Sequence, residues 1–274
     1  MTAQSRRLFA EVVRADEVDL ALACLLIGAE VRPDLDVAES LAHLDQLAAD
    51  ALATVTSDAP AYDVAVGLRA ALGDAAGFRG YSQDYGDLRA SLLHEVLRRR
   101  RGLPILLSVV YLEVGRRLGV AVRGIGLPGH FLVGVAGSTE TVLLDPFYGG
   151  RLTDAAELAA RVEEVLGGTE QLTDASLKPW SSLDILTRIL GNIRASSTSN
   201  DTLRTRLWAV ELSMLIPHHS VSLRRERGEL LARLGDYVGA AQALEDYASV
   251  ISPLDPSAAE LSLRQARLVR SRLS

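Results

Sequence analysis

Two residues that could serve as the base and the orienting carboxylate of a catalytic triad lie between Arg98 and Gly150. His130 opens the apolar segment HFLVGVA, and Asp145 follows TVLL in the next one. In a triad the histidine takes a proton from the nucleophile, and the carboxylate holds the imidazole in place. The nucleophile must be a thiol or hydroxyl within reach of the histidine. This stretch contains no cysteine, so the pattern indicates a triad frame that lacks its usual nucleophile.

A β-hairpin would bring the two residues together. Gly137-Ser138 lies between their segments, and a Gly-X pair is typical of a two-residue type II′ turn. With that turn, His130 faces Asp145 directly across the ladder, and their Cβ atoms lie about 4.5–5.5 Å apart. A slip of one residue in register would move the two side chains to opposite faces.

The element expected to support this hairpin is a buried helix just before it. The run from Pro104 to Leu118 is almost wholly apolar until Arg116, as in a helix buried on all sides. Proline suits the first helical position, and Gly119 suits the residue that ends a helix. We therefore predict a central helix over 104–118.

Ser108 supplies the hydroxyl nearest to the start of this helix, and two interpretations of it stay open. As a structural residue it would be buried and would donate back to the carbonyl of Pro104. As a nucleophile it would need His130 within hydrogen-bond distance, because a helix dipole alone does not activate a serine.

The segments that precede the central helix also have helical patterns. Apolar residues recur at helical spacing in residues 17–31, in the segment after Asp36 and in the segment after Pro60. A loop, FRGYSQDYG, leads to another helix that begins at Asp87. With three short extended segments after residue 119, these patterns predict a mainly helical α+β fold, in which a small antiparallel sheet packs on the central helix.

The C-terminal third of the chain is predicted to be helical throughout. A helix over 154–166 and a linker over 169–181 precede it. Pro217 and Pro253 close successive helix pairs 36 residues apart, and LARLGDYVGAAQALEDYASVISP resembles part of a tetratricopeptide repeat, whose period is about 34 residues. We therefore predict a core domain with N-terminal helices over 1–168 and a tetratricopeptide-like helical domain over 182–274.

Composition and charge narrow the classes of function. No apolar run is long enough to span a bilayer, and the N-terminus lacks the apolar core of a signal peptide, so a cytoplasmic protein is expected. The net charge is −6 and basic residues are spread along the chain, which disfavours nucleic acid as a partner. The run Arg98–Arg101 is either the solvated last turn of a helix or an anion-binding edge.

No cofactor or metal is expected. Cys24, the only cysteine, lies among leucines and alanines and is interpreted as a core residue, so it offers neither a disulfide nor a thiolate metal site. His218-His219 has no acidic residue nearby in sequence, and His43 and His94 lie on separate predicted helices. Neither a phosphate-binding loop nor a dinucleotide fingerprint is present.

Most of the chain resembles the SirB family of bacterial proteins. The stretches that carry the resemblance are YSQDYGDLRASLLHEVLRRRRGLPILLSVVYLEVGRRLG, GIGLPGHFLV, LLDPFYGGRL, ILTRILGNIR and the repeat-like tail. The resemblance implies a transglutaminase-like core followed by tetratricopeptide helices. The wider transglutaminase and papain-like superfamily uses a cysteine, a histidine and an aspartate. The resemblance matches His130 to that histidine and Asp145 to that aspartate, and it puts Pro104 in the place of the cysteine. It therefore implies the fold more firmly than acyl transfer.

Three hypotheses follow. The first is a cysteine-less transglutaminase-like domain that acts as a binding or regulatory module for a protein or peptide partner, with the helical tail as a further partner surface. The second is a hydrolase or acyl-transfer enzyme with His130 as general base, Asp145 as orienter and Ser108 or water as nucleophile. The third is a purely structural His130–Asp145 pair that ties two strands together.

Overall fold

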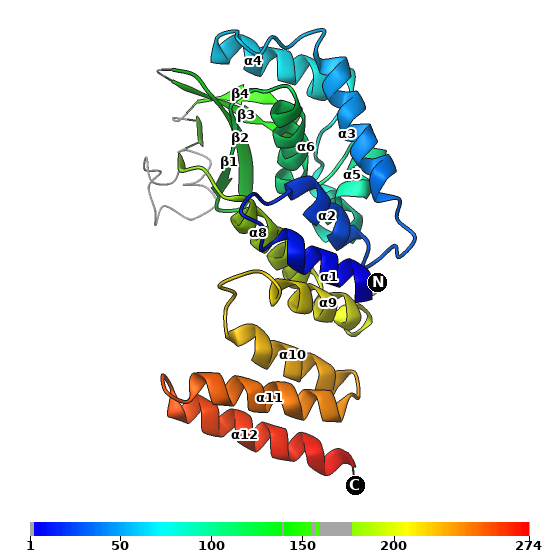
Figure 1. Cartoon of the computed structure of the whole chain (residues 1–274), viewed down its shortest axis with the longest axis vertical. Helices are drawn as coiled ribbons and strands as arrows, with labels where there is room; N and C mark the ends of the chain where they lie inside the picture. The colour runs from blue at the N-terminus through cyan, green and yellow to red at the C-terminus, as the bar shows by residue number, and fades with distance from the viewer. Residues whose placement is uncertain (1–2, 139, 155–156, 159–176, 274) are drawn as a thin grey trace. The chain divides into compact units, whose positions relative to one another are not determined.

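The computed structural model describes residues 3–138, 140–154, 157–158 and 177–273, and its contacts divide the chain into two compact units (Figure 1). Unit 1 holds residues 17–189, and unit 2 holds residues 3–16 and 190–274. The predicted boundaries at residues 168 and 182 remain predictions. Most of the predicted linker 169–181, and most of the predicted helix 154–166, fall outside the described residues.

Unit 1 is the α+β part of the chain, as predicted. Its helices before the sheet are α2 (Leu20–Gly28), α3 (Val37–Ala51), α4 (Ala61–Leu68), α5 (Leu93–Arg99) and α6 (Pro104–Arg117). A π-helical segment (Arg69–Ala75) continues α4, and two 3-10 turns (Ser82–Gly86 and Leu88–Ser91) precede α5. Helix α6 lies between the sheet and helices α2, α3 and α5 (Figure 1).

The predicted central helix is α6. Pro104 occupies its first turn, and every residue from Pro104 to Gly115 is buried. Gly119 follows its C-terminal end in the left-handed conformation, with φ of +71°, which glycine adopts without steric cost. Strands β1 and β2 pack on α6, and Gly115 permits this close approach because a Cβ there would lie 2.7 Å from Val122 Cγ1.

Four antiparallel strands form the sheet, in the order β1-β2-β3-β4. They are β1 (Val122–Leu127), β2 (His130–Ala136), β3 (Thr141–Asp145) and β4 (Arg151–Thr153). The first three match the predicted extended segments. Strand β4 was not among the predicted segments; it has only three residues and follows the glycines Gly149 and Gly150.

The predicted two-residue turn at Gly137-Ser138 is wrong. Ala136 pairs with Thr141, and the N–H of Gly137 donates to the carbonyl oxygen of Glu140 at 2.8 Å. Four residues, 137–140, therefore separate the paired ends, and the register is shifted by two residues from the predicted one. His130 and Asp145 are consequently not directly opposed. A two-residue shift nevertheless leaves each side chain on its predicted face, because the side-chain period of a strand is two.

Unit 2 is wholly helical in its described part. It contains α1 (Ala3–Val12), the end of α8 (Ser182–Ser196), α9 (Leu203–Ser213), α10 (Ser222–Arg233), α11 (Tyr237–Ile251) and α12 (Pro256–Arg270). Helices α9 to α12 pack in sequence, each on the next. Gly228 lets α10 approach α11, because a Cβ there would lie 2.8 Å from Leu244 Cγ. Helix α1 has no counterpart in our sequence prediction.

One ion-pair cluster in unit 2 predicts a pH dependence of its stability. Glu226 accepts hydrogen bonds from Arg194 and from Arg206, the latter at 2.7 Å. Burial alone would raise the pKa of Glu226. The hydrogen bonds and charges of the two arginines outweigh this effect, so the pKa of Glu226 lies below its ordinary value of 4.5. The folded-state pKa is thus below the unfolded one, so the pairs stabilise unit 2 above about pH 4.5, and this contribution is lost as the pH falls through the folded-state pKa.

Replacing Glu226→Gln is therefore expected to lower the free energy of unfolding by about 1 kcal/mol at pH 7, a figure reduced for partial exposure, and by much less near pH 3. Urea unfolding at the two pH values measures the difference. Glu229→Gln is the control, because the Glu229–Arg225 pair is about half exposed and should contribute little. An equal loss at both pH values for Glu226→Gln would contradict the prediction.

Candidate functional site

His130 and Asp145 form a direct hydrogen bond. His130 Nε2 lies 2.8 Å from Asp145 Oδ2, and the carboxylate is fully buried. The other carboxylate oxygen, Oδ1, accepts the backbone N–H of Phe147 at 3.2 Å. The His130 side chain is 12% exposed, so it retains limited contact with solvent. Because Nε2 contacts Asp145, Nδ1 is the ring nitrogen left to face a ligand or a reacting atom.

The two-residue shift in register explains why the pair still meets. In the observed register the residues are diagonal neighbours on one face of the β2–β3 ladder. Diagonal neighbours are about 7–8 Å apart at the backbone, a gap that long side chains span. Histidine and aspartate together are long enough, and the 2.8 Å contact shows that they do so.

Two aromatic rings lie next to the His130 imidazole. The ring of Phe147 lies edge-on to it with centroids 5.9 Å apart, and Tyr148 lies at 6.2 Å. Tyr85 contacts Phe147 with centroids 6.0 Å apart. Phe147 is buried, whereas Tyr85 and Tyr148 are about half exposed. The histidine thus lies beside an accessible aromatic surface.

Two of the four consecutive arginines anchor the loop that carries Tyr85. Asp84 is fully buried, and its Oδ1 accepts two hydrogen bonds from Arg101, at 2.7 and 3.0 Å. Arg99 contacts Asp87 at 3.0 Å and lies 3.9 Å from Asp84. Charge-assisted bonds of this kind are among the strongest in proteins. The predicted loop FRGYSQDYG, which contains Tyr85, is therefore held in place beside the site.

The run Arg98–Arg101 matches neither of its two interpretations in full. Arg98 is exposed and pairs with Glu95 at 2.7 Å, as a solvated last turn would. Arg100 ends α5 in the left-handed conformation. Arg99 and Arg101, however, form ion pairs with Asp87 and Asp84 of this chain. The run therefore does not form an anion-binding edge.

Ser108 is turned into the core. Its side chain is fully buried, and its hydroxyl donates to the carbonyl oxygen of Phe131 at 3.4 Å, not to that of Pro104 as the structural interpretation predicted. Phe131 follows His130 on β2, so the second turn of α6 does lie next to the start of that strand. No bond joins Ser108 to His130 within the described residues. This geometry does not favour Ser108 as a nucleophile.

Cys24 offers no alternative nucleophile. It lies in α2 and is 2% exposed. Burial raises the pKa of its thiol, and the carboxylates of Glu113 and Asp19 raise it further. A thiol with a raised pKa stays protonated and is a poor nucleophile. The interpretation of Cys24 as a core residue agrees with this environment.

Arg188 and Trp180 border the site from the segment after the sheet, and the sequence analysis did not single them out. Arg188 lies on α8, and its Nη2 donates to the carbonyl oxygen of His130 at 3.4 Å. Its guanidinium carbon lies 5.5 Å from the ring centroid of Trp180, which in turn packs edge-on to Phe131. The available signal was Arg188 within ILTRILGNIR, one of the stretches that carry the family resemblance.

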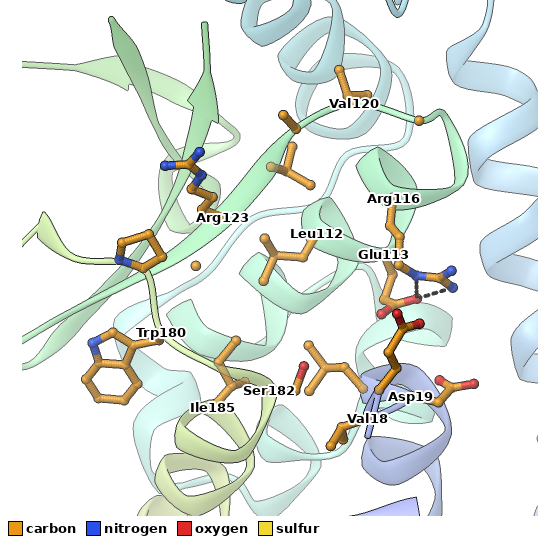
Figure 2. A pocket seen from close by; sticks show the side chains of 17 residues that line it. Val18, Asp19, Leu112, Glu113, Arg116, Val120, Arg123, Trp180, Ser182 and Ile185 are labelled. Atoms are coloured by element: carbon orange, nitrogen blue, oxygen red, sulfur yellow. Dashed lines mark hydrogen bonds and ion pairs between the residues drawn. The ribbon is translucent and has the colours of Figure 1, made fainter. Parts of the chain in front are cut away.

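A pocket of about 580 Å³ opens beside the edge strand β1 (Figure 2). Trp180 and Ile185 line one side of it, Glu113 and Arg116 the other. Two of its three acidic side chains have structural uses: Asp19 caps α2, and Glu113 pairs with Arg116 and Arg117. A second pocket of about 600 Å³ lies against β3 and β4. Neither pocket is lined by His130 or Asp145.

Among the described residues, no group of three or more histidine, cysteine or acidic side chains could hold a metal ion. Within the same residues, no helix has both the length and the apolar character needed to cross a membrane.

Comparison with known families agrees with this architecture. Residues 38–191 match the family described as Transglutaminase-like superfamily, and residues 193–274 match the family described as Tetratricopeptide repeat. The first match covers the sheet, α6 and both members of the His130–Asp145 pair.

Three relatives illustrate the range of similarity. The UPF0162 protein of Xylella fastidiosa (strain Temecula1) is 37% identical over 175 residues, which make up 62% of each chain. The UPF0162 protein of Pseudomonas aeruginosa is 35% identical over 177 residues, 63% of this chain and 62% of that one. F-box only protein 21 of Mus musculus is 33% identical over 119 residues, 42% of this chain and 19% of that one. The matched part is thus less than two thirds of each relative's length.

Proposed function

The chain belongs to the transglutaminase-like superfamily, and from that premise we propose that it is a cysteine-less member which binds a protein or peptide partner at the His130–Asp145 pair. The observation that carries the proposal is the bonded pair beside a helix whose first residue is Pro104, where the superfamily resemblance expects a cysteine. A base and its orienter without a nucleophile retain the means to recognise a polar group, but not to form an acyl-enzyme.

The surroundings of His130 support binding. Half-exposed Tyr148 lies next to the histidine, and half-exposed Tyr85 contacts Phe147, the other aromatic neighbour of the histidine. Aromatic side chains with a polar tip are enriched where proteins bind partners. Tetratricopeptide repeats present extended surfaces to other proteins, so the C-terminal unit offers a second contact region. The narrower assignment to the SirB family, a regulatory role and a cytoplasmic location are parts of this proposal.

An activity assay separates binding from the enzyme alternative. The full chain and its His130→Ala variant are incubated with a casein and cadaverine cross-linking mixture and with a library of peptide amides, and products are followed by mass spectrometry. We expect no turnover by either protein. Product formed by the full chain and abolished in His130→Ala would overturn the proposal in favour of a hydrolase or acyl transferase.

A binding assay tests the site itself. Linear peptides selected on the full chain from a displayed library are then measured against His130→Ala and against His43→Ala, a histidine on α3 away from the site. We expect the affinity to fall at least tenfold in His130→Ala and to stay unchanged in His43→Ala, at a temperature at which far-ultraviolet circular dichroism shows that all three proteins are folded. Equal affinity for all three would place the binding elsewhere and refute the proposal.

A further inference from the structure

Arg188 is a half-buried cation without a carboxylate partner in the described part of the chain. Its contacts are the carbonyl oxygen of His130 at 3.4 Å and the face of Trp180 at 5.5 Å. The other partly buried arginines of unit 1 behave differently: Arg101 pairs with Asp84, and Arg117 pairs with Asp45 and Glu113. Arg188 is therefore the exception among these arginines.

The contacts of Arg188 compensate its burial only in part. Moving a charge away from water is costly unless it is paired. One long bond to a carbonyl and one cation–π contact offset a fraction of that cost, and the remaining N–H donors of the planar guanidinium fork match a carboxylate. Burial accordingly lowers the pKa of Arg188, whereas the nearby Tyr85 hydroxyl raises it. An anion would complete this environment.

The groups around Arg188 narrow the kind of anion. Arg188 contacts the His130 backbone, the His130 ring lies 6.2 Å from the Tyr148 ring, and Phe147 contacts both Tyr148 and Tyr85, so these groups share one neighbourhood. Arg188 supplies a single positive charge and contacts the backbone of His130, whose ring bonds the buried Asp145 carboxylate. One positive charge balances a singly charged carboxylate, whereas a doubly charged phosphate would keep an unbalanced negative charge. The half-exposed rings of Tyr85 and Tyr148 suit the peptide atoms next to such a carboxylate.

We propose that Arg188 binds a carboxylate of a peptide ligand whose neighbouring atoms contact Tyr85, Tyr148 and His130. The inference rests on the proposed function and adds the chemical class of the ligand. The carboxylate belongs either to the C-terminus of a partner or to an aspartate or glutamate side chain.

Trp180 provides the reporter for the test, because Arg188 lies over its ring. The chain has two tryptophans, so the Trp208→Phe variant makes the fluorescence specific for Trp180. Three probes are titrated at constant ionic strength: acetyl-triglycine with a free carboxylate, the same peptide as a C-terminal amide, and acetyl-Gly-Asp-Gly amide. We expect a saturable change with at least one acidic probe and none with the neutral amide. Which acidic probe binds identifies the source of the carboxylate.

Variants assign the effect to Arg188. Arg188→Gln is expected to weaken binding of the acidic probe at least tenfold, and Arg188→Lys to weaken it less, because lysine keeps the charge but loses the fork. Arg123→Gln is the matched control, because Arg123 is an exposed arginine on β1 that lines the same pocket as Trp180. It should leave the affinity unchanged, and thermal unfolding checks that each variant is folded.

Three results would overturn the inference: equal binding of the neutral amide, an unchanged affinity in Arg188→Gln, or a loss in Arg123→Gln alone. These results are distinguishable from failure of the proposed function. If displayed peptides still require His130 while no acidic probe requires Arg188, the binding function stands and only the carboxylate site is refuted.

Discussion

Replacing Asp145→Ala is expected to lower the free energy of unfolding by about 2–5 kcal/mol. The carboxylate is fully buried, and its two oxygens accept hydrogen bonds from His130 and from the backbone N–H of Phe147. Alanine would leave the His130 ring and the Phe147 N–H without these acceptors where little water can replace them, and it would open a small cavity. Urea unfolding of the full chain, monitored by the near-ultraviolet circular dichroism of its aromatic residues, measures this loss of stability.

A double-mutant cycle with His130→Ala shows how much of that loss belongs to the pair. If the pair is coupled, the double variant should be more stable than the sum of the single changes predicts, by about 0.5–3 kcal/mol. Asp154→Ala serves as the control, because Asp154 is exposed and accepts one local bond, from the N–H of Glu157. A loss below about 0.5 kcal/mol for Asp145→Ala would show that the described contact contributes little to the fold.

The Gly80→Ala variant is expected to lose about 1–3 kcal/mol of stability and to weaken ligand binding at His130. A Cβ at Gly80 would lie 1.9 Å from Cδ2 of the buried Phe147 ring. The backbone cannot simply retreat, because the N–H of Gly80 donates to the carbonyl oxygen of Phe147 at 2.8 Å. The ring must therefore move, and that ring lies edge-on to His130.

Gly86→Ala is the matched control for this variant. Gly86 ends the 3-10 turn of the same loop, and a Cβ there would have no heavy atom within 4 Å. Unfolding in urea and the affinity for a selected peptide are measured for both variants. Equal behaviour of the two would mean that Phe147 adapts without cost and that its position does not shape the site.

The local patterns of the chain predicted the elements well. The central helix was expected over 104–118 and runs from Pro104 to Arg117, because its proline, its apolar run and its closing glycine are all local signals. The α+β class was predicted for the same reason. Strand β4 was missed because three residues after two glycines carry too little periodicity to be distinguished from a turn.

The register of the β2–β3 hairpin shows where local patterns stop being sufficient. A Gly-X pair suits a two-residue turn, yet the loop from Gly137 to Glu140 is longer and closes through a different bond. The choice between these loops depends on how both strands pack on the rest of the sheet, which no short segment specifies. His130 and Asp145 still lie on the same face of the sheet, because the predicted register was wrong by two residues, an even number.

By itself, the sequence determined which groups are available at the site: a histidine and an aspartate on neighbouring strands, a proline at the start of the central helix, and one cysteine within an apolar run. Only the tertiary structure decided which atoms meet. It joins His130 Nε2 to Asp145, turns Ser108 toward the carbonyl of Phe131, and brings Arg188 to the backbone of His130 across 58 residues of chain. Residue type and periodicity are local properties, whereas partners are selected by packing between segments far apart in the chain.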